Sequence, residues 1–133
     1  MKKYLSLIVC ALTLAACHTA SDHSCAYYRS NLESPVYFEF GTANITAESK
    51  QKISEGVVFL QNHRFKRVQL DGYADEIGGD TESNMELSRD RVEAVRDFLV
   101  ENGVAKKRIS MSWHGVRKGK PYNKNRRVEI TVK

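Results

Sequence analysis

Four short segments of this 133-residue chain alternate apolar and polar residues with a period of two, which is typical of β-strands covered on one face. In the first segment, Val36, Phe38 and Phe40 point to one side of the chain. The same period recurs in residues 68–74, 109–113 and 128–132. Strands that are apolar on one side only predict a sheet with one face packed and the other in water.

Two longer segments between these strands repeat with the period of a helix. Between the first two strands, Thr46 is a candidate N-cap and is followed by Ile53, Val57 and Leu60 at i, i+4 and i+7. Between the second and third strands, an apolar stripe ends at Asn102-Gly103, a common helix C-terminal signal. The stripe consists of Leu87, Val92, Val95, Phe98 and Leu99. Two helices on one face of a four-stranded mixed sheet predict an α/β (α+β) two-layer sandwich with the order βαβαββ.

The first 16 residues have the features of a signal peptide. Lys2 and Lys3 precede a short apolar run that is too short to span a bilayer as a helix, which needs about 20 residues. The run ends in Leu14-Ala15-Ala16-Cys17, which resembles the lipobox of bacterial lipoproteins. We therefore expect residues 1–16 to be a lipoprotein signal peptide and Cys17 to carry acyl chains such as palmitate.

Residues 17–34 contain few aliphatic side chains and no sustained period, so we expect a lipidated N-terminus and linker, followed by one domain over residues 35–133. His18, His23 and Cys25 are too few and too loosely placed to predict a metal site, and no cofactor is expected. Once Cys17 is lipidated, Cys25 has no partner within the mature chain. It is either a free thiol or a link between two chains.

Cleavage before Cys17 leaves 133 − 16 = 117 residues, enough for one domain. Removing Lys2 and Lys3 leaves 21 − 2 = 19 basic residues against 16 acidic ones, a formal charge of +3. This small surplus favours anionic surfaces without indicating a nucleic-acid partner, which secretion also excludes. The basic segment 116–125 is expected to be an exposed loop.

An acidic and a basic residue stand at a strand end and in the following helix. Asp75 follows the strand over residues 68–74, and Arg91 lies inside the apolar stripe of the helix, at about 40° from Val95 and 20° from Phe98 on a helical wheel. A guanidinium that faces the sheet needs polar partners. Asn84, seven residues before Arg91, is a candidate helix N-cap or ligand contact. The residues alone leave two readings open: Asp75 and Arg91 neutralise each other, or they hold the two ends of a small zwitterion.

The motifs Gly72-Tyr73-Ala74-Asp75 and Asn84-x-x-Leu87-Ser88-x-x-Arg91 resemble those of the OmpA-like peptidoglycan-binding domains found in Pal-like lipoproteins and some outer-membrane porins. Val36 to Phe40 and the closing Asn125 to Glu129 extend the resemblance over residues 36–132. The resemblance implies a non-enzymatic protein that binds the diaminopimelate end of peptidoglycan stem peptides. It implies that Asp75 accepts from the ligand ammonium and that Arg91 binds its carboxylate.

The same resemblance implies a wider pocket and a location. Asn84, Ala74 and the turn at Gly41-Thr42 would complete the peptidoglycan site. The family usually carries an acid or amide where this chain has Gly41, and the loop 76–83 is one residue longer than usual. His18 stands where Asp would mark inner-membrane retention, so we expect the periplasmic face of the outer membrane.

Two other functions remain as alternatives. A wall-cleaving enzyme is not expected, because the sequence has no nucleophile–base pair, paired carboxylates or metal-ligand cluster. His114, beside Gly115 at a strand end, is expected to be an ordinary surface residue. The second alternative keeps the fold but makes the main partner a periplasmic protein of the Tol type, as in Pal-like scaffolds.

Overall fold

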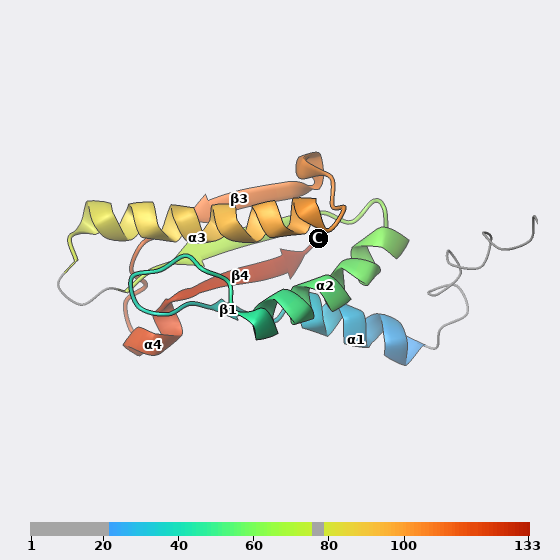
Figure 1. Cartoon of the computed structure of the whole chain (residues 1–133), viewed down its shortest axis with the longest axis horizontal. Helices are drawn as coiled ribbons and strands as arrows, with labels where there is room; N and C mark the ends of the chain where they lie inside the picture. The colour runs from blue at the N-terminus through green and yellow to red at the C-terminus, as the bar shows by residue number, and fades with distance from the viewer. Residues whose placement is uncertain (1–21, 76–78) are drawn as a thin grey trace, which may run out of the picture.

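The computed structural model describes residues 22–75 and 79–133, so the signal peptide, Cys17, His18 and residues 76–78 lie outside the described residues. Helices and strands alternate along the chain (Figure 1). In chain order they are α1 Asp22–Leu32, β1 Val36–Tyr37, α2 Ala47–Asn62, β2 Val68–Tyr73, α3 Thr81–Glu101, the 3₁₀ turn η1 Lys106–Arg108, β3 Ile109–Trp113, α4 Tyr122–Asn125 and β4 Arg127–Val132.

The four strands form one mixed sheet in the order β1-β4-β2-β3. β2 and β3 are parallel, with Val68 opposite Ile109, and β4 lies antiparallel to both β1 and β2. The predicted α+β sandwich with a four-stranded mixed sheet is confirmed. The structure adds α1, η1 and α4 to the expected elements. Because β2 and β3 are parallel, the residues that follow them meet at one end of the sheet, where β4 begins.

Local capping chemistry fixes the ends of the two long helices. Thr46 caps α2 as predicted, because its side chain accepts from the main-chain N–H of Ser49 at 3.2 Å. Asp80 caps α3 in the same way, accepting from Ser83 at 2.7 Å. The hydrogen bonds that Asp80 accepts, chiefly those from the main chain and side chain of Ser83, lower its pKa. The predicted C-terminal signal of α3 is confirmed, with Asn102 as C-cap and Gly103 at φ +94°.

Strand β1 is shorter than the alternation predicts. Only Val36 and Tyr37 pair with β4, and the chain then turns, with Thr42 N–H donating to Glu39 O at 3.3 Å. Phe38 is still buried, but Phe40 is 58% exposed, so its expected place on the packed face is wrong. The turn, in which Gly41 adopts φ +68°, ends the period-two register before Phe40.

The segment predicted as a linker contains helix α1, which packs on α2. Leu32 is fully buried, and a Cβ on Gly56 of α2 would lie only 2.5 Å from the Leu32 Cβ. Tyr27 and Asn31 both donate to Glu55 of α2 at 3.0 Å. Folded structure therefore begins before residue 35, because contacts with α2 hold a helix that has little amphipathic pattern of its own.

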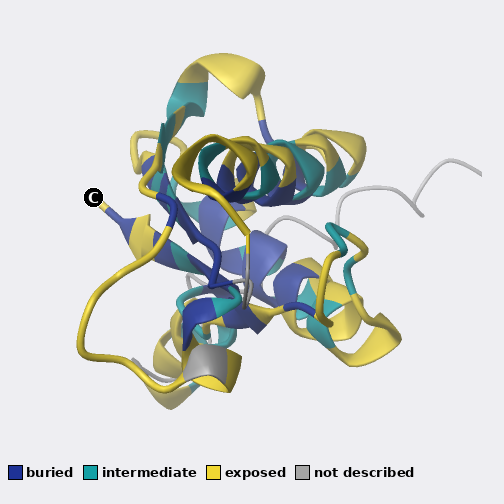
Figure 2. Ribbon diagram, turned by 90° about the vertical axis from the view of Figure 1, so that its left-hand side faces the viewer, coloured by how far each residue is buried: buried dark blue, intermediate teal, exposed yellow. Residues whose placement is uncertain are grey.

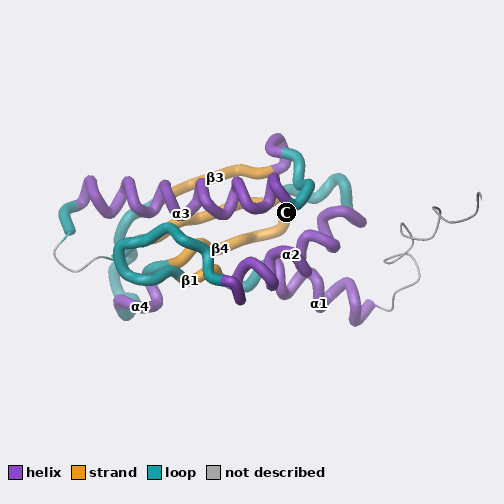
Figure 3. The backbone as a smooth tube through the Cα atoms, in the orientation of Figure 1, coloured by secondary structure: helices purple, strands orange, loops and turns teal. Residues whose placement is uncertain are grey.

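Helices α2 and α3 cover the packed face of the sheet, and their inward sides are buried while their outer sides are exposed (Figure 2). The core joins Ile53 and Leu60 of α2 to Val92 and Leu99 of α3 and to Leu70 of β2. The segment between β1 and α2 is an irregular loop that runs close to α3 (Figure 3). None of the helices in the described part of the chain is long and apolar enough to cross a membrane.

Candidate functional site

The carboxylate of Asp75 lies just beyond the end of β2 and is only 8% exposed. Its Oδ2 accepts from the Nδ2 of Asn125 at 3.2 Å. Asn125 is itself held by the main chain of Arg117, to whose carbonyl it donates at 2.8 Å. The preceding residue, Ala74, donates its N–H to Gly115 O at 2.8 Å. Asp75 is therefore positioned by contacts from α4 and from the loop before it, and not by its own strand alone.

The guanidinium of Arg91 is completely buried beneath the loop between β1 and α2. Its Nε donates to Thr42 O at 2.8 Å, one terminal nitrogen donates to Tyr73 O at 3.2 Å, and the other donates to Glu39 O at 3.2 Å. The Phe38 ring lies 5.3 Å from the guanidinium carbon. The predicted placement of Arg91 on the packed side of α3 is confirmed, and main-chain carbonyls of β2 and of the turn after β1 fix its orientation.

Asp75 and Arg91 thus reach the same end of the sheet with different partners. Arg91 bonds to Tyr73 O, two residues before Asp75. Among the described residues, no hydrogen bond or ion pair joins the two side chains, since Asp75 accepts from Asn125 and Arg91 donates to carbonyls. In this structure, therefore, these contacts of Asp75 and Arg91 are made to different groups.

Asn84 lies inside α3, so its predicted role as N-cap is wrong. Asp80 takes that place because the helix begins one turn earlier, at Thr81. The Asn84 side chain is buried, and its Nδ2 lies 3.4 Å from Gly79 O.

The other predicted site residues contribute mainly through the main chain. Thr42 supplies the carbonyl that orients Arg91, and Gly41 is exposed at the tip of the same turn. Ala74 is fully buried, so its side chain packs and does not line an open surface. The carbonyl of Thr42 and the carbonyl of Tyr73, the residue before Ala74, both accept from Arg91.

Arg127, to which the sequence assigned no role, is buried at the same end of the sheet. Its Nε donates to Glu129 Oε1 at 2.8 Å, a terminal nitrogen donates to Lys124 O at 3.0 Å, and its guanidinium lies 4.1 Å from the Tyr73 ring centroid. Burial, followed by the charges of Glu129 and Asp71, raises the pKa of Tyr73. The only sequence signal for Arg127 was its place in the closing motif Asn125 to Glu129.

His114 contacts Asp71 and Tyr73, both of β2. Its Nε2 lies 2.8 Å from Asp71 Oδ1, and its ring stacks on Tyr73 at 5.0 Å between centroids. Within residues 22–75 and 79–133, no three His, Cys, Asp or Glu side chains form a group that could hold a metal ion. Cys25 is a free, half-buried thiol of α1.

Comparison with known proteins places this geometry in a family. The profile of the OmpA family matches residues 37–130, which contain helices α2 to α4, strands β2 and β3 and most of β4. The chain belongs to the OmpA family. The match contains both Asp75 and Arg91 and begins after α1.

Relatives of known name share part of this OmpA-family chain. A peptidoglycan-associated lipoprotein of Mesorhizobium japonicum is 28% identical over 78% of this chain and 61% of its own length. Outer membrane protein P5 of Haemophilus influenzae is 32% identical over 64% of this chain and 24% of its own length. The chain therefore spans less than two thirds of these relatives. The crystal structure of the peptidoglycan-associated lipoprotein from Burkholderia pseudomallei has a TM-score of 0.69 at 23% identity, covering 80% of this chain and 99% of that one, a likeness of fold.

Proposed function

We propose that this protein is a lipid-anchored outer-membrane protein that binds peptidoglycan non-covalently, through the diaminopimelate end of stem peptides, and so tethers the membrane to the cell wall. The observation that carries the proposal is the separate fixing of a carboxylate and a guanidinium at one end of the sheet, Asp75 by Asn125 and Arg91 by three carbonyls. The names of the relatives, peptidoglycan-associated lipoprotein and outer membrane protein, support the same wall and envelope assignment.

The free end of diaminopimelate carries an ammonium and a carboxylate on one carbon, so it is a small zwitterion. Asp75 accepts from the ammonium, and the positive charge of Arg91, held beneath the loop between β1 and α2, attracts the carboxylate. Because Asn125 and the Thr42 carbonyl already hold these side chains, little conformational entropy is lost on binding. We assign Asn84, in α3, and the Gly41-Thr42 turn to the same site.

Such a site binds one stem peptide weakly. Each charge-assisted hydrogen bond contributes about 1.5–3 kcal/mol, and the cost of association leaves a Kd in roughly the micromolar range or above. Many anchored copies on a repetitive polymer raise the overall retention far above that of one site. A tether built from weak contacts holds the wall while single contacts exchange.

Replacing Asp75 with asparagine tests the carboxylate without removing its packing. The asparagine oxygen still accepts from Asn125, whereas the charge that attracts an ammonium is gone. We expect binding to purified sacculi to weaken by about 10- to 100-fold, the loss of one charge-assisted hydrogen bond. Co-sedimentation of the detergent-solubilised protein with sacculi measures this change.

The matched control for this test is Asp71→Asn, on the same strand. Asp71 lies opposite Glu129 of β4 and pairs with His114, whereas Asp75 accepts from Asn125. We expect this variant to pellet with sacculi as well as the unaltered protein does. Equal pelleting of Asp75→Asn and Asp71→Asn would contradict the assignment of Asp75 to the ligand.

The anchor is proposed at Cys17. Two or three acyl chains bury many CH₂ groups at about 0.8 kcal/mol each, enough for stable membrane attachment. Cys17→Ser should abolish labelling of the protein by fatty acids in cells and release it from the membrane fraction. The control is Cys25→Ser, which removes the thiol of α1 and should leave labelling unchanged. Labelling that persists in Cys17→Ser would place the lipid elsewhere.

The scaffold alternative differs from wall tethering in what Asp75→Asn does in cells. If a periplasmic protein of the Tol type were the main partner, the variant would lose sacculus binding and still be recovered with that partner after cross-linking. If wall binding is the main role, the membrane detaches from the wall in the same cells. Electron microscopy of the envelope distinguishes the two results.

A further inference from the structure

The end of the domain opposite Asp75 carries a cluster of cations around one protruding aromatic ring. Phe65, in the turn between α2 and β2, is 101% exposed. Six exposed basic residues lie in this turn, in η1 and at the end of β4, and we call them, with Phe65, the basic end. They are Arg64, Lys66, Arg67, Lys106, Lys107 and Lys133.

The fold itself gathers these residues. β2 and β3 are parallel, so the segments that precede them lie at one end of the sheet, and antiparallel β4 ends there as well. Arg67 bonds Lys133 by two main-chain hydrogen bonds of 2.9 and 3.0 Å and donates a side-chain hydrogen bond to Lys107 O at 3.0 Å. The main-chain segments that carry Arg67, Lys107 and Lys133 are therefore held next to one another.

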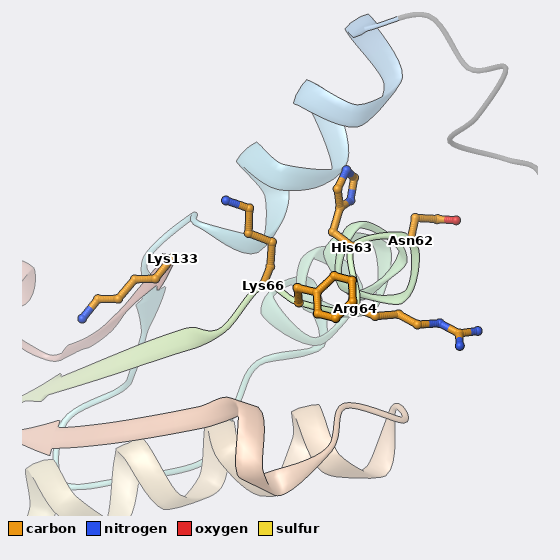
Figure 4. Close-up of a pocket in the computed structure, with 6 residues that line it drawn as sticks. Asn62, His63, Arg64, Lys66 and Lys133 are labelled. Carbon is orange, nitrogen blue, oxygen red and sulfur yellow. The ribbon is translucent and has the colours of Figure 1, made fainter.

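The turn that carries Phe65 is firmly held. Arg108 donates to Lys66 O at 2.9 Å and to His63 O at 2.8 Å, which fixes the turn on both sides of Phe65. An open hollow of about 700 Å³ lies beside it, and the side chains of Arg64 and Lys133 extend in opposite directions from its rim (Figure 4). The turn therefore holds the exposed phenyl ring of Phe65 in a fixed place beside the cations.

The chemistry of the basic end selects an anionic partner with an apolar layer. Residues 62–67, 104–109 and 131–133 contain no Asp or Glu side chain. Each Lys or Arg near an anionic lipid surface raises membrane partitioning about five-fold. Aromatic rings prefer the boundary between headgroups and acyl chains. A nucleic acid or a glycan also offers a surface on which Phe65 can stack, so the position of the basic end decides between these partners.

Position favours the same partner. β2 is six residues long, so its start, beside the basic end, and its end, beside Asp75, lie about 20 Å apart. α1 begins on the same side of the molecule as the turn after α2 (Figure 1). Asp22 is 22 − 17 = 5 residues from Cys17, a span of at most about 18 Å. A lipid on Cys17 thus brings the basic end, and not the Asp75 end, next to the membrane.

We propose that the basic end docks on anionic phospholipid headgroups, with Phe65 in the interface, and thereby points the Asp75 and Arg91 end away from the membrane. The inference rests on the proposed lipid anchor for the nearness of the bilayer, but not on the identity of the wall ligand. Docking turns a domain on a short tether into one with a defined orientation. The proposed wall-binding site then faces the wall and not the membrane.

A tryptophan reporter tests the orientation. Trp113 is the only tryptophan of the chain and ends β3, opposite Gly72, so it is far from the basic end. The variant Phe65→Trp with Trp113→Phe moves the reporter to the basic end. The anchored protein is reconstituted into vesicles of brominated phosphatidylcholine with or without phosphatidylglycerol, and quenching of tryptophan fluorescence by the brominated chains is measured.

We expect strong quenching of the moved reporter in vesicles with phosphatidylglycerol, weak quenching in phosphatidylcholine alone, and weak quenching of native Trp113 in both. Adding Lys66→Glu and Lys107→Glu to the reporter should lower docking at least about 25-fold, from two lost cations at about five-fold each. The matched control, Lys118→Glu with Lys120→Glu, makes the same change of net charge in the loop before α4 and should leave quenching intact.

Equal quenching of the moved reporter and of native Trp113 would overturn the proposal, as would equal effects of the two charge reversals. The wall function is read separately. The reporter with Asp75→Asn should dock normally but pellet weakly with sacculi. The reporter with Lys66→Glu and Lys107→Glu should dock poorly but pellet normally. A failure in either assay therefore identifies which of the two proposals is wrong.

Discussion

Replacing Arg91 with leucine should lower the free energy of unfolding by about 3–5 kcal/mol and abolish binding to sacculi. Leucine fills part of the buried volume but leaves the carbonyls of Glu39, Thr42 and Tyr73 without their donor. A buried group left unsatisfied costs about 1–3 kcal/mol, and water reaches some of these carbonyls at the half-buried loop. Urea unfolding, followed by circular dichroism, measures the change in stability.

Two further variants separate the charge of Arg91 from its contacts. Arg91→Lys keeps a cation but loses the fork that bonds several carbonyls at once, so it should remain folded, less stable than the native protein, and bind sacculi weakly. The control is Arg89→Leu, on the exposed side of the same helix, where only a long 3.9 Å ion pair to Asp90 is lost. We expect that variant to lie within about 0.5 kcal/mol of the native protein. If Arg91→Leu were as stable as Arg89→Leu, the carbonyl contacts would not hold this end of the fold.

The parts of the fold that sequence predicted are those in which one element alone carries the signal. The period of two in residues 68–74 follows from a strand with one packed face, and the observed strand, Val68–Tyr73, buries Val68 and Leu70. The helical wheel placed Arg91 among apolar residues, and the side chain is fully buried there. Local pattern was enough because burial on each element depends on its own period.

Helix α1 could not be predicted because its stabilising contacts lie outside its own sequence. Its residues are mostly polar, and only Leu32 and Tyr28 pack on the core. Its helical form depends on two contacts with α2. Gly56 allows α2 to approach Leu32 closely, and Tyr27 and Asn31 donate hydrogen bonds to Glu55. Such contacts over about 25 residues leave no periodic signal in the segment itself.

The candidate site shows the same division. Asp75 and Arg91 could be placed at one end of the sheet, since each sits on an element with a clear pattern. Asn125, which holds Asp75, comes from a residue 50 positions later in the chain, and this pairing has no local signature. The error at Asn84 has a local cause, because both Asp80 and Asn84 are good N-caps and only the structure shows which begins the helix.

Gly72, the first residue of the motif that ends at Asp75, marks the closest approach of β2 to α3. A methyl group on Gly72 would overlap Val92 Cγ2 and the main-chain oxygen of Ser88, both on α3. Gly72→Ala should therefore push α3 away from the sheet and lower the free energy of unfolding by about 3 kcal/mol, at the upper end of overpacking costs. Because α3 carries Arg91 and β2 leads into Asp75, sacculus binding should fall as well. Urea unfolding and co-sedimentation measure the two effects.

Two variants show whether the clash with the main chain causes this loss. Gly119→Ala places the same methyl group where no atom lies within 4 Å, at φ +82°, so only the strain of about 1 kcal/mol is expected and wall binding should be kept. Gly72→Ala combined with Val92→Ala removes the side-chain overlap but leaves the overlap with Ser88 O, so stability should not recover. Full recovery in the double variant would mean that side-chain crowding alone, and not the approach of the two backbones, requires glycine at this position.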